Sequence, residues 1–377
     1  MRNHFSLAQI SGGGDSVAQD KENTERILRP LPTLSDVAQA AGVALSTASK
    51  ALNGQGKLRP ETRERVLEAA KQLGFRPNDL AQSLVRGRSF TVGLLSTDNY
   101  GRFSIPLVTG IEDALVNAQI SVFLCNTLGS PEREQQHLDS LLAKHVDGII
   151  VTSDRTNSRA PIDLGKLDLP VIYAYTRVED PNVLCILPDD EQGARLAVEH
   201  LIKQGRRHFA HITGPVYFEA VQLRAKEMRA VLGEHDIPFT ERRVLSGAWE
   251  ESWGYEAANI LLDRDPLIDA IFCGSDQIAR GVVDGLRERG IRVPEDIAIT
   301  GFDNWEVMAT AVRPPLTTVD LNLHELGKLA GTRLLQMIDG QRPTGIERVP
   351  CSLVVRESSA AQSKSIQTKS KIQQREA

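Results

Sequence analysis

The sequence is poor in cysteine and in aromatic residues, and it contains no long apolar run. Its 377 residues include four cysteines, at positions 125, 185, 273 and 351, which lie far apart and form no CxxC pair. This spacing excludes a zinc ribbon and predicts a reducing, cytoplasmic location. No stretch approaches the roughly 18 consecutive apolar residues of a membrane helix. Residues 1–17 also lack the apolar core of a signal peptide.

Motifs of nucleotide-dependent enzymes are missing as well. No GxGxxG follows a predicted strand, no GxxxxGK[ST] occurs, and the cluster Gly12–Gly14 lies in a polar leader. His208 and His211 flank the start of a predicted strand and should point apart, so they and nearby His200 predict no metal site. The acidic run 189–191 is interpreted as a helix start at a domain crossover. No nucleophile with a partnered base can be named, so we predict neither an enzyme nor a cofactor.

The chain has no large excess of charge of either sign, since 44 Lys and Arg stand against 49 Asp and Glu. The resulting net charge of −5 is unevenly distributed. Residues 31–88 hold nine basic and five acidic residues, residues 1–30 hold four of each, and the remainder therefore carries −9. A small basic module before a large acidic body is a hint of nucleic-acid binding.

The acidic body alternates short apolar runs with amphipathic helical segments. Continuous apolar runs predict strands that are covered on both faces, which is typical of a parallel sheet between helices. The pattern restarts near residue 190, so we predict two doubly wound subdomains with a pocket at the carboxyl ends of their strands. The predicted strands are TVGLLS, SVFLCN, DGIIVT, PVIYAY, FAHITG, DAIFCG and IAITGF.

The basic module has the pattern of a helix-turn-helix. In TLSDVAQAAGVALSTASKALNG, Thr33 and Asp36 form a capping pattern, Gly42 ends the first helix, and a second helix is predicted from about Leu45 to Leu52. A third helix, RPETRERVLEAAKQLG, begins with Pro60 at its first position. We expect its buried face to consist of Val66, Leu67, Ala70 and Leu73.

These segments resemble the LacI family of bacterial transcription regulators. The resemblance is carried by the two segments above, by FRPNDLAQSL after the third helix, and by HLIKQGRRHFAHITGP, RVPEDIAITGFDN and RPPLTTVD in the body, in order over about residues 31–357. It implies a helix-turn-helix domain followed by a periplasmic-binding-protein-like core of two doubly wound subdomains. The expected organisation is a disordered leader at 1–29, the DNA-binding domain at 31–76, a hinge and linker at 77–89, the core at 90–357 with crossovers near 189, 319 and 346, and a disordered tail at 358–377.

The resemblance also implies a set of DNA-binding residues. Leu45 and Ser46 match the two main base-reading positions of the family, and Lys50 matches a third. The matching phosphate-binding positions are Thr47, Ser49, Asn53, Lys57 and Thr62. The chain departs from the family at Ala44, where the family commonly has a capping hydroxyl.

Residues 78–85 match the hinge helix of the family, which folds on the operator and enters the minor groove. Leu84 matches the side chain that wedges into the central base step and kinks the duplex. Asn78 and Ala81 belong to the same expected contact, and Arg86-Gly87-Arg88 follows it. The alternative interpretation of Leu84 is an ordinary core residue of a linker helix.

The matching effector pocket lies between the two subdomains of the core. Arg224, Asp303 and Trp249 match residues that hold a ligand in the family, the last by stacking on sugar in some members. A carboxylate and an arginine can each hold vicinal hydroxyls while an aromatic face covers the ring. Further matching positions are Phe103, Thr152, Tyr175, Ser275 and Asp276, with Ser275 and Glu227 departing from the usual family residues.

The resemblance implies a homodimeric cytoplasmic repressor that binds a near-palindromic operator and is controlled by a small effector, with a mono- or oligosaccharide favoured. The alternatives are a co-repressor-dependent regulator, a purine effector, or a sugar-binding protein with no role on DNA. The last would need a secretion signal and no helix-turn-helix, and both features point the other way.

Overall fold

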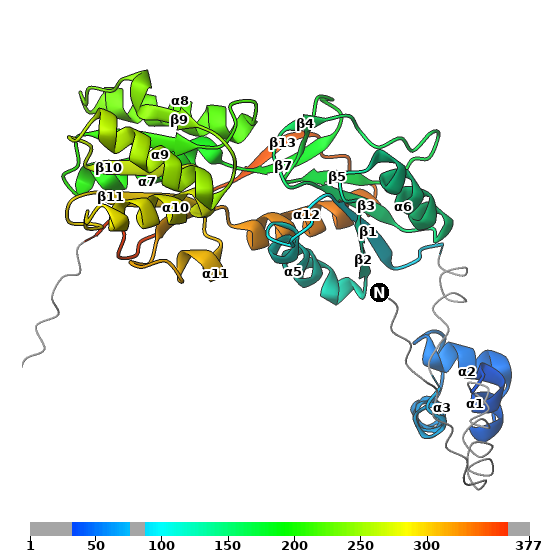
Figure 1. Ribbon diagram of the computed structural model, residues 1–377. Helices are drawn as coiled ribbons and strands as arrows, with labels where there is room; N and C mark the ends of the chain where they lie inside the picture. The colour runs from blue at the N-terminus through cyan, green and yellow to red at the C-terminus, as the bar shows by residue number, and fades with distance from the viewer. Residues whose placement is uncertain (1–31, 76–86, 361–377) are drawn as a thin grey trace, which may run out of the picture. The chain divides into compact units, whose positions relative to one another are not determined.

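The computed structural model describes residues 32–75 and 87–360, and the chain divides after Gly87 into two compact units. In the smaller unit, three helices span Leu34–Ala40 (α1), Leu45–Leu52 (α2) and Pro60–Leu73 (α3) (Figure 1). The Thr33 side chain accepts a hydrogen bond from the Asp36 amide while the Asp36 carboxylate accepts one from the Thr33 amide, which confirms the capping pattern at α1. Gly74, in the left-handed conformation, ends α3.

Small residues form the interior of this unit. Ala48 and Ala51 of α2 pack against Val37 of α1 and Val66 and Ala70 of α3. The expectation that α3 also buries Leu67 and Leu73 is wrong, since these side chains are 49% and 39% exposed. The buried stripe of α3 is Val66, Ala69 and Ala70, and a residue one position after Val66 projects away from it.

The larger unit contains two six-stranded sheets, which confirms the predicted class of two doubly wound subdomains (Figure 1). Sheet 1, which forms subdomain 1, has the strand order β13-β7-β5-β3-β1-β2, and all of its strands are parallel. Its strands are β1 Thr91–Ser96, β2 Ser121–Asn126, β3 Gly148–Thr152, β5 Val171–Ala174, β7 Leu184–Pro188 and β13 Gly345–Val349.

Sheet 2, which forms subdomain 2, has the strand order β14-β12-β11-β10-β8-β9, with only β14 antiparallel to its neighbour. Its strands are β8 Phe209–Thr213, β9 Val244–Ser246, β10 Ala270–Cys273, β11 Ala298–Asp303, β12 Thr317–Asp320 and β14 Ser352–Val354. Strands β4 (Ser158–Arg159) and β6 (Arg177–Val178) pair as a small separate sheet.

Helices cover both faces of each sheet. In subdomain 1, α5 (Ser104–Leu115) and α12 (Leu323–Ile338) pack together on one face of the sheet and α6 (Pro131–Ala143) packs on the other. In subdomain 2, the helices are α7 Asp190–Lys203, α8 Glu219–Glu234, α9 Glu251–Arg264, α10 Asp276–Glu288 and the short α11 Glu306–Ala309, with a 3-10 turn at Glu241–Arg243. A second 3-10 turn, Val116–Ala118, follows α5 in subdomain 1. No helix of the described ranges is both long and apolar enough to cross a bilayer.

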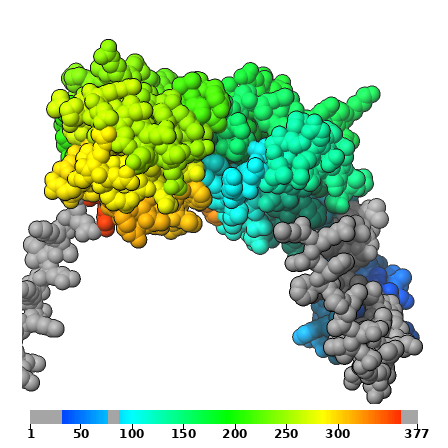
Figure 2. Space-filling model, in the orientation of Figure 1, coloured from blue at the N-terminus to red at the C-terminus, as the bar shows by residue number. Residues whose placement is uncertain are grey.

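The chain passes between the subdomains three times: after Pro188, between β12 and α12, and between β13 and β14. Helix α7 follows a strand of sheet 1 and packs on sheet 2, whereas α12 follows a strand of sheet 2 and packs on sheet 1. Figure 2 shows the two subdomains lying against one another, with green to yellow residues on one side and cyan to teal residues on the other.

The ordered core continues past the end expected at residue 357. Ser358 and Ser359 are fully buried. The Ser358 Oγ donates to the Ile299 carbonyl and accepts from the Thr317 amide, both at 2.8 Å. These two serines therefore belong to subdomain 2, and their polar composition gave no sign of it because their partners lie 41 to 159 positions away.

Candidate functional site

The first candidate site is the outward face of α2. Ala48 and Ala51 face the interior of the small unit, and the opposite side of the helix faces solvent. Leu45 is 53% exposed at the first turn, and Ser46 and Lys50 are exposed beside it. Helix α2 has Ala44 as its N-cap and no side-chain capping bond, which leaves the amides of its first turn without a hydroxyl partner from that residue.

The residues expected to hold phosphates lie around this face. Thr47, Ser49 and Asn53 are half-buried on α2 or at its end, and the Asn53 side-chain amide donates to the Ser49 Oγ at 3.4 Å. Lys57 is exposed in the loop after α2, and Thr62 is half-buried in the first turn of α3. The expected hinge residues lie outside the described part of the chain; they are Asn78, Ala81 and Leu84.

The second candidate site is a cavity of about 500 Å³ between the two subdomains. Its walls follow the carboxyl ends of parallel strands from both sheets, as expected for doubly wound folds. Subdomain 1 contributes residues after β1, β3 and β5, and subdomain 2 contributes residues after β8, β9, β10 and β11. Of the sequence-predicted ligand residues, the structure brings six together in this lining: Phe103, Tyr175, Arg224, Trp249, Ser275 and Asp303.

Arg224 is the most buried charged residue of the cavity, at 3% exposure. It lies in the second turn of α8, and its guanidinium forms an ion pair with Asp190 at 2.7 Å and donates to the Gly274 carbonyl at 2.8 Å. Burial opposes its charge, but the carboxylates of Asp190 and Asp303 together raise its pKa. Arg224 therefore stays a fixed cation whose position is set by a buried partner.

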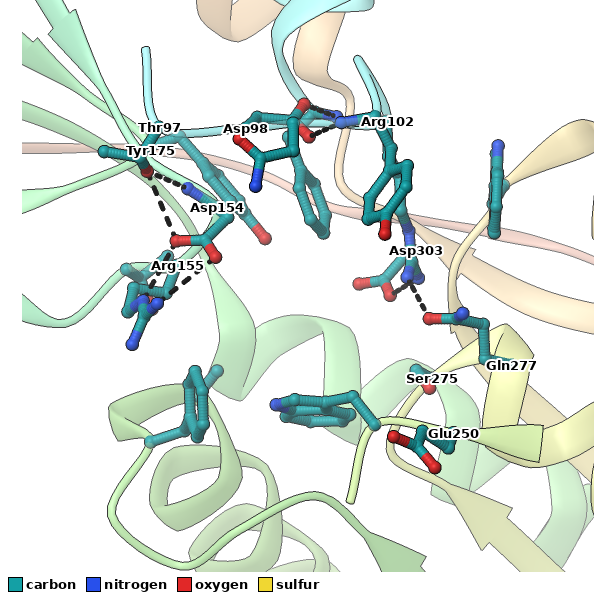
Figure 3. A pocket seen from close by; sticks show the side chains of 18 of the residues that line it. Thr97, Asp98, Arg102, Asp154, Arg155, Tyr175, Glu250, Ser275, Gln277 and Asp303 are labelled. Carbon is teal, nitrogen blue, oxygen red and sulfur yellow. Dashed lines mark hydrogen bonds and ion pairs between the residues drawn. The ribbon is translucent and has the colours of Figure 1, made fainter. Parts of the chain in front are cut away.

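Asp303 ends β11 with a positive φ of 99° and points into the cavity. Burial raises the pKa of its carboxyl group, and the nearby guanidiniums of Arg102 and Arg224 oppose that rise. Arg102, from the loop before α5, forms an ion pair with Asp303 and also donates to the Gln277 Oε1 at 2.8 Å (Figure 3). Asp303 is thus shared between a guanidinium of each subdomain.

Trp249 supplies an aromatic surface. A Cβ atom on Gly214 would lie 2.2 Å from the indole, so only glycine lets this ring settle on the end of β8. Phe218 contacts Trp249 edge-on, with ring centroids 5.6 Å apart, and Arg155 lies 5.4 Å from the Phe218 ring. Asp154 and Arg155 lie across the cavity from Asp303 (Figure 3).

On the subdomain 1 side, Phe103 and Tyr175 stack with ring centroids 4.8 Å apart. Tyr175 has a positive φ of 58°, a conformation that non-glycine residues rarely adopt, and burial raises the pKa of its phenol well above the ordinary value. Backbone strain at two lining residues, Tyr175 and Asp303, is typical of a functional site.

Three sequence-predicted residues support the cavity from positions at or behind its wall. Ser275 is the N-cap of α10, where its Oγ accepts from the Ile278 amide at 3.3 Å. Asp276 is fully buried outside the lining and accepts hydrogen bonds from the Trp305 amide at 2.7 Å and the Thr318 hydroxyl at 2.5 Å. Thr152 is buried at the end of β3, also outside the lining.

The sequence analysis missed several lining residues, above all Arg102. It also missed the role of Asp190, which lies outside the lining and forms an ion pair with Arg224. The run 189–191 was correctly placed at a helix start, with Asp189 as N-cap of α7. Its neighbour Asp190 gave no signal of pairing with a residue 34 positions away. The other missed lining residues are Thr97, Asp98, Asn99, Tyr100, Asp154, Arg155, Thr156, Phe218, Ala220, Glu250, Gln277 and Trp305.

Two segments of the chain match known protein families. Residues 33–78 match the bacterial regulatory proteins of the lacI family, and residues 198–359 match the periplasmic binding protein-like domain. The first match covers the three-helix unit, and the second covers subdomain 2 from the last turns of α7 onward, together with α12 and β13.

Similarity to whole proteins extends over both units. The chain is 32% identical over 330 residues to the ribose operon repressor of Halalkalibacterium halodurans, covering 87% of this chain and 97% of that protein. A transcriptional regulator CelR–cellobiose complex is similar at 31% identity with a TM-score of 0.62, covering 87% of this chain and 99% of the other. The lac repressor dimer bound to operator and the anti-inducer ONPF is similar at 28% identity with a TM-score of 0.72, covering 88% and 99%.

Proposed function

The chain belongs to the LacI family of bacterial regulatory proteins, and we propose that it is a cytoplasmic, homodimeric repressor that a small sugar releases from its operator. It is a DNA-binding transcription regulator under the control of an effector, in a family that is not enzymatic. The cytoplasmic location, the repressing action, the sugar and the homodimer are proposals.

The observation that carries the sugar proposal is the composition of the cavity. Trp249 offers an aromatic surface, which suits the C–H face of a sugar ring. Asp303 offers an acceptor and Arg224 a donor for vicinal hydroxyls, which suits the ring edge. A cavity of about 500 Å³ lies within the usual range for small-ligand sites. Two similar proteins carry ribose or cellobiose in their descriptions, which supports the same class.

A purine is the second candidate, because the stacked rings of Phe103 and Tyr175 form one wall of the cavity. Aromatic rings of this kind also pack against a flat base. A co-repressor of either class would strengthen operator binding instead of weakening it, so the direction of the ligand's effect on DNA binding separates an inducer from a co-repressor. A ligand screen separates a sugar from a purine.

A thermal-shift screen of the full chain against mono- and disaccharides, cellobiose included, and against purine bases tests the ligand class. We expect a sugar to raise the melting temperature, because a ligand that binds only the folded state stabilises it. Trp249→Leu should abolish that shift. Trp253→Leu is the matched control, because the Trp253 indole donates to the Thr213 carbonyl and lies outside the cavity lining. A shift with purines alone would reject the sugar.

Footprinting on the DNA upstream of the chain's own gene tests the repressor proposal. In our proposal, Leu45, Ser46 and Lys50 contact base edges, and the hinge residues 78–85 with Leu84 bend the centre of the site. We expect a near-palindromic footprint that disappears when the sugar found by the screen is added. No footprint at low salt, where non-specific contacts are strongest, would reject the proposal.

The exposed edge strand β2 supports the homodimer. Phe123 and Leu124 on β2 are 45% and 50% exposed, and Val116 and Leu128 beside it are 66% and 51% exposed. An apolar sheet edge of this kind is usually covered. Light scattering should give a dimer for the wild type and a monomer for Phe123→Glu, whereas Val307→Glu, an equally apolar exposed site on α11, should stay dimeric. A wild-type monomer would reject the homodimer.

A further inference from the structure

Polar contacts join the two subdomains at two opposite rims of the cavity. At one rim, Arg102 of subdomain 1 forms an ion pair with Asp303 and a 2.8 Å hydrogen bond with Gln277, both in subdomain 2. At the other rim, the Asn157 side-chain amide donates to the Tyr217 carbonyl at 2.9 Å, and Arg177 forms an ion pair with Glu219 at 3.0 Å. The two subdomains are therefore joined across the cavity by their side chains.

The Arg102 contact differs from the others in its burial. The side chains of Arg102 and Asp303 are only 12% and 8% exposed, whereas Arg177 and Glu219 are 30% and 24% exposed. The guanidinium carbon of Arg102 lies 5.0 Å from the ring centres of both Phe103 and Trp305, so one aromatic ring from each subdomain holds it. Solvent screens this pair weakly, and of the two ion pairs that join the subdomains at the rims it is the more buried.

Arg102 also occupies the carboxylate that the proposed function assigns to the effector. The Nη2 group donates to an Asp303 oxygen that a ligand hydroxyl would otherwise contact. Two other guanidiniums line the cavity: Arg224 is already paired with Asp190 and lies 3.9 Å from Asp303, and Arg155 is paired with Asp154. An entering ligand therefore competes with Arg102, and it does not compete with Arg224.

We propose that Arg102 is a clasp: its guanidinium occupies the Asp303 carboxylate that the effector would contact, and it holds the two subdomains together until an effector displaces it. This inference rests on the proposed function for the identity of the effector site, but the link between the subdomains needs no effector. A ligand opens the clasp at low cost only when it brings a hydroxyl or amine donor to Asp303. Otherwise a buried carboxylate loses its partner.

Hydrogen-exchange mass spectrometry of the ligand-free full chain tests the clasp. In Arg102→Ala we expect exchange to quicken by about tenfold, the effect of losing a charge-assisted hydrogen bond in an open–closed equilibrium. The increase should occur in the facing segments 98–105 and 301–306 and also at the opposite rim, in 153–158 and 216–220. Asp303→Asn should quicken exchange in the same four segments.

Methylguanidinium chloride is the probe that separates a clasp from a merely structural side chain. Added to Arg102→Ala, it should slow exchange at both rims toward the wild type, while sodium chloride at equal ionic strength should not. It should have no such effect in Asp303→Asn, which lacks the carboxylate. Arg159→Met is the control, because Arg159 forms a comparable pair with Glu134 inside subdomain 1, at 2.6 Å.

The clasp is refuted if Arg102→Ala quickens exchange only in 98–105 and 301–306, or if methylguanidinium reverses nothing. It is also refuted if Arg159→Met opens the rims equally. Unchanged exchange in β8 and β10 shows that the variants remain folded, and Asp303→Asn carries the same test if Arg102→Ala does not fold. Because no sugar enters these measurements, their failure leaves the proposed function standing.

Discussion

The outward face of α2 comes from a single helix of eight residues, whereas the cavity is assembled from strand ends of two sheets. The α2 side chains are exposed or half-buried and make few contacts with one another. The arginines of the cavity form buried ion pairs, Arg224 with Asp190 and Arg102 with Asp303. We therefore expect substitutions on the outward face of α2 to change recognition and leave stability alone, whereas substitutions in the cavity should change both.

The largest expected effect is that of Arg224→Met. The change leaves Asp190 buried without its partner, which should lower the free energy of unfolding of the core by about 3–5 kcal/mol. All three tryptophans, at positions 249, 253 and 305, lie in the larger unit, so tryptophan fluorescence during urea titration reports on the unfolding of that unit. Lys226→Met is the matched control on the same helix, because its pair with Glu191 is exposed. Equal losses in both variants would remove the contrast between buried and exposed charges.

The second-largest effect is expected in the pH dependence of stability, which separates the buried cavity from the exposed face of α2. Burial, and then the charge of Asp303, raises the pKa of Asp276 from 3.8 to about 7. The folded protein thus holds this proton more tightly than the unfolded chain, and its contribution to stability falls as the pH rises from about 4 to 7. We expect Asp276→Asn to lose less stability than the wild type between pH 5 and pH 7.5 in urea titrations. A difference between the two that does not vary with pH would contradict this.

On α2, Leu45→Ser should change DNA binding without changing stability. Loss of a base contact costs about 1–3 kcal/mol of operator binding, whereas an exposed substitution changes stability by no more than about 0.5 kcal/mol. Fluorescence anisotropy on the footprinted site and on unrelated DNA measures the first. Lys57→Ala is the comparison, and it should weaken binding to both DNAs and reduce the salt dependence. A Leu45→Ser variant that weakens both DNAs equally would not be a base-reading change.

The smallest effect is expected at the start of α2. Ala44 has the extended conformation of an N-cap but no side-chain acceptor. Ala44→Ser should supply one and stabilise α2 by about 0.5–1 kcal/mol. Hydrogen exchange of the amides at 46–48 in the full chain measures this gain, and Ala44→Val, which has no acceptor, should show none. Equal protection in both variants would mean that the cap position is already satisfied.

The sequence predicted best what depends on near neighbours. The helix from Leu45 to Leu52, its buried alanines and the cap at Thr33 follow from residues within one or two turns, and the structure contains all of them. The apolar runs at 91–96 and 148–152 likewise became parallel strands, since they are covered on both faces. The prediction that Leu67 and Leu73 are buried was wrong, because apolar character alone does not determine which side of α3 faces so small an interior.

The cavity residues were predicted only through positions that match the family. Arg224 and Asp303 were found in this way, but Arg102 was not, because its partner lies 201 positions further along the chain and no local pattern connects the two. Asp190 was assigned correctly to a helix start and not to the ion pair it makes. Pairing between distant loops is a product of the fold, and a single sequence contains no periodicity that records it.

The three passages between the subdomains also constrain how the protein is made. During synthesis, sheet 1 lacks α12 and β13 until residue 349 has left the ribosome. Sheet 2 gains β14 only at residues 352–354. Neither subdomain is a continuous segment that could finish folding early. A premature stop anywhere before that point would leave both sheets with an uncovered face or edge. The nascent core is therefore exposed to proteases and to aggregation until almost its last residue, and it then completes both halves together.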